Sequence, residues 1–155
     1  MTQNESFPKT FNGALAPMGV RAAVKMLMPL LLKGADPFCA VLREQYRRSR
    51  IVRVELTGLG FYVDFDVAED APTTSPPSFT GGDADIRIDT PHHPGGCVVY
   101  VRGGRLQTLE VFTFDGVWAE ESRLVSVESV DSLCPYAERP EALCYGIETD
   151  DSRVD

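Results

Sequence analysis

The chain has 155 residues, 43% of them hydrophobic and 25% charged, which is ordinary for one globular domain and excludes a disordered or fibrous class. Its net charge of −8 disfavours general nucleic-acid binding and favours basic partners. The charge is uneven, because residues 1–53 hold nine Lys/Arg and three Asp/Glu, whereas residues 54–155 hold six and twenty. We therefore expect a single domain over residues 1–155, basic at its N-terminal end and acidic beyond it.

The four cysteines are scattered without any C-x-x-C pair, at Cys39, Cys97, Cys134 and Cys144. This spacing favours buried, reduced thiols in a cytoplasmic protein over a zinc ribbon or a secreted disulfide scaffold, although Cys134 and Cys144 could be bridged. The first 15 residues lack the pattern of a secretory signal. The most apolar stretch, residues 26–32, is too short to span a bilayer, so we expect no membrane contact.

The first helix is predicted to begin at Pro17, after a loosely ordered arm over residues 1–16. Apolar side chains recur every three to four residues, at Val20, Ala23, Val24, Leu27 and Leu31. Pro29 should kink or divide this helix because it lacks an N–H group, and Gly34 is suited to end it.

A second helix is predicted from Asp36, a favourable N-cap, and Pro37, which suits the first helical position. Its apolar side carries Phe38, Val41, Leu42, Gln45 and Tyr46. The opposite side aligns Arg43, Arg47 and Arg50. This stripe could hold phosphate or an acidic partner, or it could be a solvated face lying against the chain's own acidic sheet.

From Ile51 the hydrophobic period changes to two, which indicates strands. The segments "RIVRVELTG" and "GFYVDFDVA" predict an antiparallel hairpin, and residues 69–82 a loop rich in proline, serine, threonine and glycine. A third strand is expected over residues 83–89.

Two further strands are expected on either side of Gly103-Gly104, with a bulge near Gln107 or Thr108. The segment "SRLVSVESVDSL" could supply another strand, and residues 147–155 are expected to be a loosely ordered tail. The predicted fold is therefore α+β, an antiparallel β-meander of about five strands packed against the N-terminal helices.

The chain's two histidines follow the third predicted strand in "GGDADIRIDTPHH". Carboxylates and imidazoles bind divalent ions, so Asp85, Asp89, His92 and His93 could centre a small metal-dependent enzyme or ligand-binding site. However, adjacent residues of an extended segment point oppositely, so at most one histidine would converge with Asp89. The sequence contains no phosphate loop, no H-E-x-x-H and no G-x-S-x-G motif. The main interpretation therefore includes no catalytic residue, metal or cofactor.

Several carboxylates are expected at outward positions of the predicted sheet, at Asp64, Asp66, Asp83, Asp85 and Asp89. An acidic surface of this kind suits docking against a basic partner, although it could also serve only solubility. An exposed aromatic residue, Tyr62 or Trp118, could anchor such a contact.

The stretches "LTGLGFYVDFDV" and "GGCVVYVRGGRLQTLEVFTFDGVW" resemble small, mostly uncharacterised bacterial proteins with a "tG.GF" hairpin and a strand pair reading roughly "DG.L..LE.ft". The similarity covers residues 51–118. This sequence departs from the pattern at Gly103, where the pattern has Asp. Small acidic α+β proteins of this sort are typical of immunity proteins in bacterial toxin systems. The resemblance implies a role in inhibition but assigns no individual residue.

The first hypothesis is thus a non-enzymatic binding protein, an immunity-type inhibitor that blocks a bacterial toxin or another basic partner through its acidic sheet surface. The metal-centred enzyme or ligand-binding protein is the alternative. A third possibility is self-association, with the basic helix of one copy on the acidic sheet of another.

Overall fold

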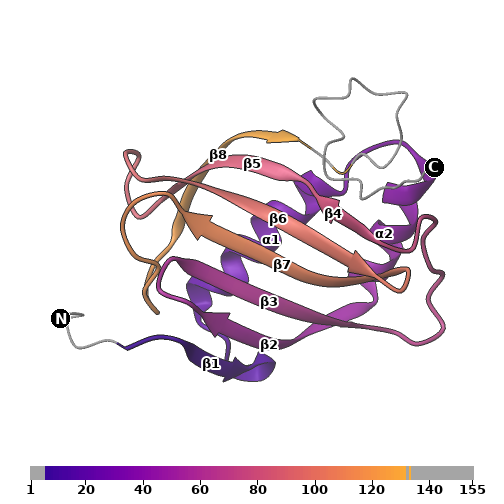
Figure 1. Ribbon diagram of the computed structural model, residues 1–155, viewed down its shortest axis with the longest axis horizontal. Helices are drawn as coiled ribbons and strands as arrows, with labels where there is room; N and C mark the ends of the chain where they lie inside the picture. The colour runs from indigo at the N-terminus through magenta and orange to yellow at the C-terminus, as the bar shows by residue number, and fades with distance from the viewer. Residues whose placement is uncertain (1–5, 132, 134–155) are drawn as a thin grey trace.

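The structure of the protein is a computed structural model that describes residues 6–131 and 133. In this part of the chain, two α-helices lie against one face of an antiparallel sheet of eight strands (Figure 1). In chain order the elements are β1 (Lys9–Asn12), the 3-10 helix η1 (Gly13–Leu15), α1 (Met18–Leu31), α2 (Pro37–Arg47), β2 (Ser49–Leu56), β3 (Gly60–Val67), β4 (Phe79–Gly81), β5 (Asp83–Ile88), β6 (Pro94–Arg102), β7 (Arg105–Thr113) and β8 (Leu124–Asp131). The predicted α+β class is confirmed, and the strand count exceeds the predicted five.

The strands follow the order β1-β2-β3-β7-β6-β5-β8, and β4 also pairs with β6. A meander would keep consecutive strands side by side, but β7 lies between β3 and β6. The predicted meander is therefore wrong in its connections. Strand β1 forms within the arm that we expected to be loosely ordered, and β4 within the expected loop. Both depend on pairing with distant strands, β2 and β6, which local sequence does not reveal.

Helix α1 buries the apolar stripe that its spacing predicts. The side chains of Val20, Ala23, Val24, Leu27 and Leu31 all lie in the core. Pro29 does not divide the helix, which continues to Leu31. The proline lies in the last turn, where few backbone hydrogen bonds follow it, and the helix ends before Gly34.

Helix α2 begins as predicted. The Asp36 carboxylate accepts a hydrogen bond from the Cys39 N–H at 2.9 Å, and Pro37 opens the first turn. The helix ends at Arg47, so Arg50, which we had placed on its surface, belongs to β2. There Arg50 is paired with Asp66 of β3, and this pairing takes the chain out of the helix.

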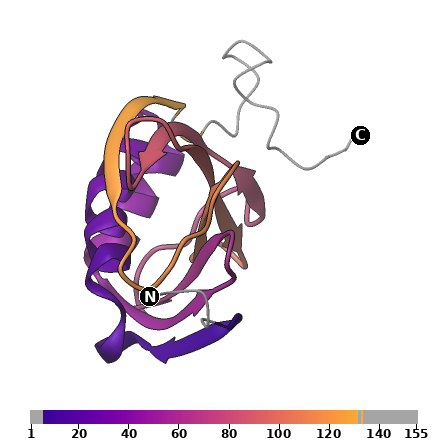
Figure 2. The same ribbon diagram turned by 90° about the vertical axis from the view of Figure 1, so that its left-hand side faces the viewer.

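The sheet is strongly curved around the helices, and β8 lies close to α1 (Figure 2). The core fills the space between the helices and the concave face of the sheet. Gly103 and Gly104, with φ of 61° and 75°, form the tight turn between β6 and β7. Tyr100 pairs with Thr108 and Val101 with Leu106, so Gln107 is the extra residue of the predicted bulge.

Cys39 and Cys97 are buried free thiols. Cys134, Cys144 and the expected tail over residues 147–155 lie outside the described residues. Within the described residues, no helix combines the length and apolar character needed to cross a membrane.

Candidate functional site

The outer, convex face of the sheet carries most of the side chains that the sequence nominates for partner binding. The described helices cover the opposite face (Figures 1 and 2). In β3, Tyr62, Asp64 and Asp66 alternate with buried side chains and point outward, and in β5 Asp83 and Asp85 do the same. The alternation predicted for both strands is confirmed.

Asp64 and Asp66, hereafter the β3 aspartates, are both compensated by positive charge. Asp64 accepts a hydrogen bond from the Thr108 hydroxyl at 2.9 Å and lies 3.6 Å from the guanidinium of Arg53. Asp66 lies 3.5 Å from the guanidinium of Arg50. Arg53 is also 3.1 Å from Glu55, so the two arginines reduce the negative charge of the β3 aspartates without fully neutralising this part of the outer face.

A bulge in β2 brings the two arginines to this face. Ile51 pairs with Phe65 and Arg53 with Asp64, which leaves Val52 as an extra residue. In a regular strand, residues three apart point to opposite faces. The bulge therefore lets Arg50 and Arg53 lie beside the two β3 aspartates.

Two tyrosines flank one carboxylate at the centre of the outer face. The Tyr100 hydroxyl donates a hydrogen bond to Glu110 Oε1 at 2.7 Å, and Tyr62 lies directly across from Glu110. The hydrogen bond to Glu110, together with burial, raises the pKa of Tyr100 to about 12. Burial and the charge of Glu110 raise the pKa of Tyr62. Both tyrosines thus stay protonated and form a polar aromatic surface of the kind found in protein interfaces.

A second acidic region, hereafter the β5–β8 acidic surface, consists of Asp83, Asp85, Asp131 and Phe114. Asp83 is directly opposite Asp131 in the register of β5 and β8. All four side chains line a hollow of about 240 Å³. Asp85 pairs with Arg87 at 2.5 Å, whereas Asp83 and Asp131 have no ion-pair partner among the described residues. Phe114 is 69% exposed beside them.

The two acidic regions are separate. Strands β7 and β6 lie between β3 and β5 in the sheet. The carboxylates that we expected to form one continuous acidic face therefore form two regions, and only the β5–β8 acidic surface keeps unpaired negative charge.

Asp89 does not belong to either region, because the strand ends at Ile88. Asp89 has a φ of 66°, a conformation that Asp tolerates better than most residues. Its carboxylate accepts hydrogen bonds from the Arg123 N–H at 2.9 Å and the Ser122 hydroxyl at 3.1 Å. Asp89 therefore holds the segment before β8 against the end of β5, and the expectation that it continues the outward strand face is wrong.

The histidines and their nominated carboxylates do not converge. His93 Nδ1 lies 3.2 Å from Asp115 Oδ1, His92 is exposed, and Asp85 and Asp89 have the separate partners given above. Among the described residues, no group of three His, Cys, Asp or Glu side chains could hold a metal ion. The geometry offers the metal-centred alternative no support.

Trp118 is 0% exposed, so the expectation of an exposed anchor at this position is wrong. The backbone N–H of Trp118 donates to the Gly58 carbonyl at 2.9 Å, which draws the segment after β7 across the turn between β2 and β3. The indole then packs edge-on against Phe61, with ring centroids 5.0 Å apart. Trp118 therefore stabilises the core.

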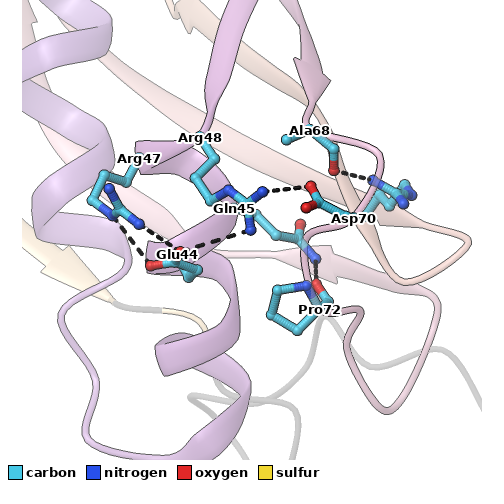
Figure 3. A network of polar contacts seen from close by, with 8 residues as sticks. Glu44, Gln45, Arg47, Arg48, Ala68, Asp70 and Pro72 are labelled. Carbon is cyan, nitrogen blue, oxygen red and sulfur yellow. Dashed lines mark hydrogen bonds and ion pairs between the residues drawn. The ribbon is translucent and has the colours of Figure 1, made fainter.

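The arginines at the end of α2 have partners within the chain (Figure 3). Arg47 pairs with Glu44 at 2.6 Å, and Arg48 pairs with Asp70. Arg43 donates to backbone carbonyls at the end of α1. In the predicted arginine stripe, Arg43 and Arg47 thus have these partners, and Arg50 belongs to β2 and lies beside Asp66. This division weakens the idea of a basic helix that binds a second copy.

Gln45, between these arginines, is fully buried and joins α2 to the sheet. Its amide nitrogen donates to the carbonyl of Pro72 at 2.7 Å (Figure 3). The same nitrogen donates to the carbonyl of Gly104 at 2.8 Å, and the amide oxygen accepts from the Leu106 N–H at 2.8 Å. Since every polar atom of this side chain is bonded, Gln45 is a structural residue.

Sequence reasoning missed Asp131, Phe114 and Tyr100 as surface residues of interest. Asp131 belongs to β8, whose alternation is weak, and its proximity to Asp83 depends on pairing between strands far apart in the chain. Phe114 directly follows a strand, and the dipeptide "DG" after it is a turn signal that indicates exposure.

Comparisons with protein-family models, with curated proteins and with solved structures give no match to this chain. The resemblance to immunity-type proteins therefore stays a prediction.

Proposed function

We propose that the chain is a non-enzymatic binding protein that docks a basic protein on the outer face of its sheet, as an immunity-type inhibitor docks on a toxin. The observation that carries this proposal is the β5–β8 acidic surface. There, Asp83 and Asp131 face each other without an ion-pair partner among the described residues, beside a largely exposed Phe114.

This arrangement is unfavourable in the free protein. Like charges directly opposite each other destabilise a sheet, and an exposed aromatic ring leaves apolar area in water. A lysine or arginine of a partner could lie between the two carboxylates while an apolar side chain covers Phe114. Binding would then relieve both unfavourable features.

Tyr62, Tyr100 and the β3 aspartates would extend the contact along the outer face. The carboxylates of the β3 aspartates and of Glu110, which accepts from Tyr100, already have partners in the chain. We therefore expect these residues to add shape and hydrogen-bonding complementarity to the interface rather than electrostatic attraction. Electrostatic attraction, and hence the rate of encounter, would come from the β5–β8 acidic surface.

The first partner to test is the product of the neighbouring reading frame, by coexpression and then by interferometry with the purified proteins. Asp83→Lys should weaken binding by about tenfold, because it reverses one of the two unpaired charges. Glu121→Lys is a matched control, since Glu121 is an exposed carboxylate outside the strands, and its effect should stay below about twofold. Equal effects of the two changes, or no complex at all, would contradict the proposal.

A further inference from the structure

A separate hollow between α1, α2 and β2 is lined by positive charge. Its volume is about 310 Å³, and its charged lining comes from three elements: Arg21 and Lys25 of α1, Arg47 of α2 and Arg50 of β2. Among the described residues, no carboxylate lines it. The chain has a net charge of −8, but these four cations make the electrostatic potential around the cleft locally positive.

Two of these cations keep their charge uncompensated. The Arg21 guanidinium donates to the carbonyls of Gly13 at 2.6 Å and Ala16 at 3.3 Å, which fixes the side chain without neutralising it. Lys25 is exposed and has no ion-pair partner in the described part of the chain. A guanidinium has five N–H donors, and Arg21 donates only two bonds, to the Gly13 and Ala16 carbonyls, so it retains donors for a ligand.

The other two cations are only partly engaged. Arg47 pairs with Glu44, and Arg50 lies at the longer distance of 3.5 Å from Asp66. Both side chains are more than two-thirds exposed, so Arg47 can contribute to the potential of the cleft directly, whereas Arg50 borders the cleft from the outer face, beside Asp66.

The remaining lining of the cleft is largely apolar. It consists of Val24, Ile51, Phe65, the ring of Tyr46 and the polar Ser49. Tyr46 packs edge-on against Phe65, with ring centroids 6.0 Å apart. Burial raises the pKa of Tyr46, so its hydroxyl stays protonated and can donate a hydrogen bond.

The cleft is accessible from solvent at its charged rim. The pairing of β1 with β2 ends at Asn12 and Arg53, and η1 then lies against Ile51 and Val52. Lys25 and Arg47 on the helix side of the cleft are exposed, so a ligand can enter between the helices and β2 without any movement of the sheet.

We propose that this cleft binds a small organic anion, with a carboxylate or phosphate group held by Lys25 and Arg21 and a short apolar part on the floor formed by Ile51 and its neighbours. The volume lies at the small end of the range of about 300–1,000 Å³ for ligand pockets, which suits a molecule of one ring. The cleft is distinct from the β5–β8 acidic surface, so this proposal does not depend on the proposed protein-binding function.

The test uses phenyl phosphate, titrated into the full chain and followed by calorimetry and by backbone amide shifts. We expect saturable binding with the largest shifts at residues 49–51. Inorganic phosphate and phenol, which each carry one half of the probe, should bind at least about tenfold more weakly. Benzoate in a parallel titration distinguishes a carboxylate ligand from a phosphate ligand, and preference for either supports the proposal.

Lys25→Glu should weaken binding of the preferred probe by about tenfold without disturbing the fold, because Lys25 is exposed and unpaired among the described residues. Lys33 is another exposed lysine, just beyond α1. Lys33→Glu is therefore the matched control and should change binding by less than about twofold. Equal losses in both variants, or no saturable binding of phenyl phosphate or benzoate, would overturn the proposal. Inorganic phosphate or phenol binding as tightly as phenyl phosphate would overturn it as well.

Discussion

The triplet Asp64-Phe65-Asp66 in β3 lies beside β2, whose outward arginines are within 3.6 Å of its carboxylates. The triplet Asp83-Ala84-Asp85 in β5 lies beside β8, which places Asp131 opposite Asp83 and Ser129 opposite Asp85. The two triplets have the same pattern of acidic and apolar residues and the same alternation of exposure. The surroundings of Asp83 are the opposite of those of Asp64 and Asp66, because its neighbouring strand presents a carboxylate and not an arginine. Asp85, in contrast, is compensated by Arg87 of its own strand.

This contrast shows that the adjacent strand sets much of the charge environment of a D-x-D triplet on a sheet. In β3, a single-residue bulge in β2 brings both compensating arginines to the outer face. In β5, regular pairing near Asp83 brings a third carboxylate instead. A partner that seeks negative charge should therefore distinguish the two triplets.

The largest effect is expected from Asp64→Ala. This change removes the acceptor of the buried Thr108 hydroxyl and one of the two acidic neighbours of Arg53, the other being Glu55. We expect the free energy of unfolding to fall by about 1–3 kcal/mol, as measured by urea denaturation. Asp66→Ala is the control, since its exposed pair with Arg50 should contribute only about 0–1 kcal/mol. If both changes destabilise equally, Asp64 has no special role in the β3 region.

A smaller effect of opposite sign is expected from Asp131→Asn. Removing one of two facing carboxylates relieves repulsion across β5 and β8, so the free energy of unfolding should rise by about 0.2–1 kcal/mol. Urea denaturation measures this change. A double-mutant cycle with Asp83→Asn sharpens the result, because the double variant should gain no more than the better single variant. Destabilisation by Asp131→Asn would remove the contrast between the two triplets.

The smallest effect is expected from salt. Added sodium chloride screens the repulsion between Asp83 and Asp131, so the stability advantage of Asp131→Asn over the unchanged chain should shrink by a few tenths of a kcal/mol, roughly, at high salt. Urea denaturation at several salt concentrations measures this difference. An advantage that is constant across the series would show that the stabilisation is not electrostatic.

The parts of the fold that local sequence encodes were predictable. The start of α2 follows from Asp36 and Pro37, and the hairpin between β6 and β7 follows from Gly103-Gly104. The position of β7 between β3 and β6 was not predictable, because it depends on pairing between strands whose sequences fit several neighbours equally well. Periodicity assigns a residue to a face of a strand, but it does not select the adjacent strand.

The same limit applies to the candidate site. The outward direction of Asp64, Asp66, Asp83 and Asp85 follows from alternation and is confirmed. Trp118 and Asp89 were assigned wrongly because contacts with distant residues set their environment. The Trp118 backbone is bonded to Gly58 and its indole packs on Phe61. The Asp89 carboxylate is bonded to Ser122 and Arg123.

The buried amide of Gln45 has a consequence for the order in which the chain folds. Its three hydrogen bonds reach residues 27, 59 and 61 positions further along the chain. The first forms only when the loop after β3 reaches α2, and the other two only when the turn between β6 and β7 does. An isolated helix of the length of α2 is only marginally stable in water. We therefore expect the second helix to dock late, after the hairpin of β6 and β7 has formed the surface that receives it.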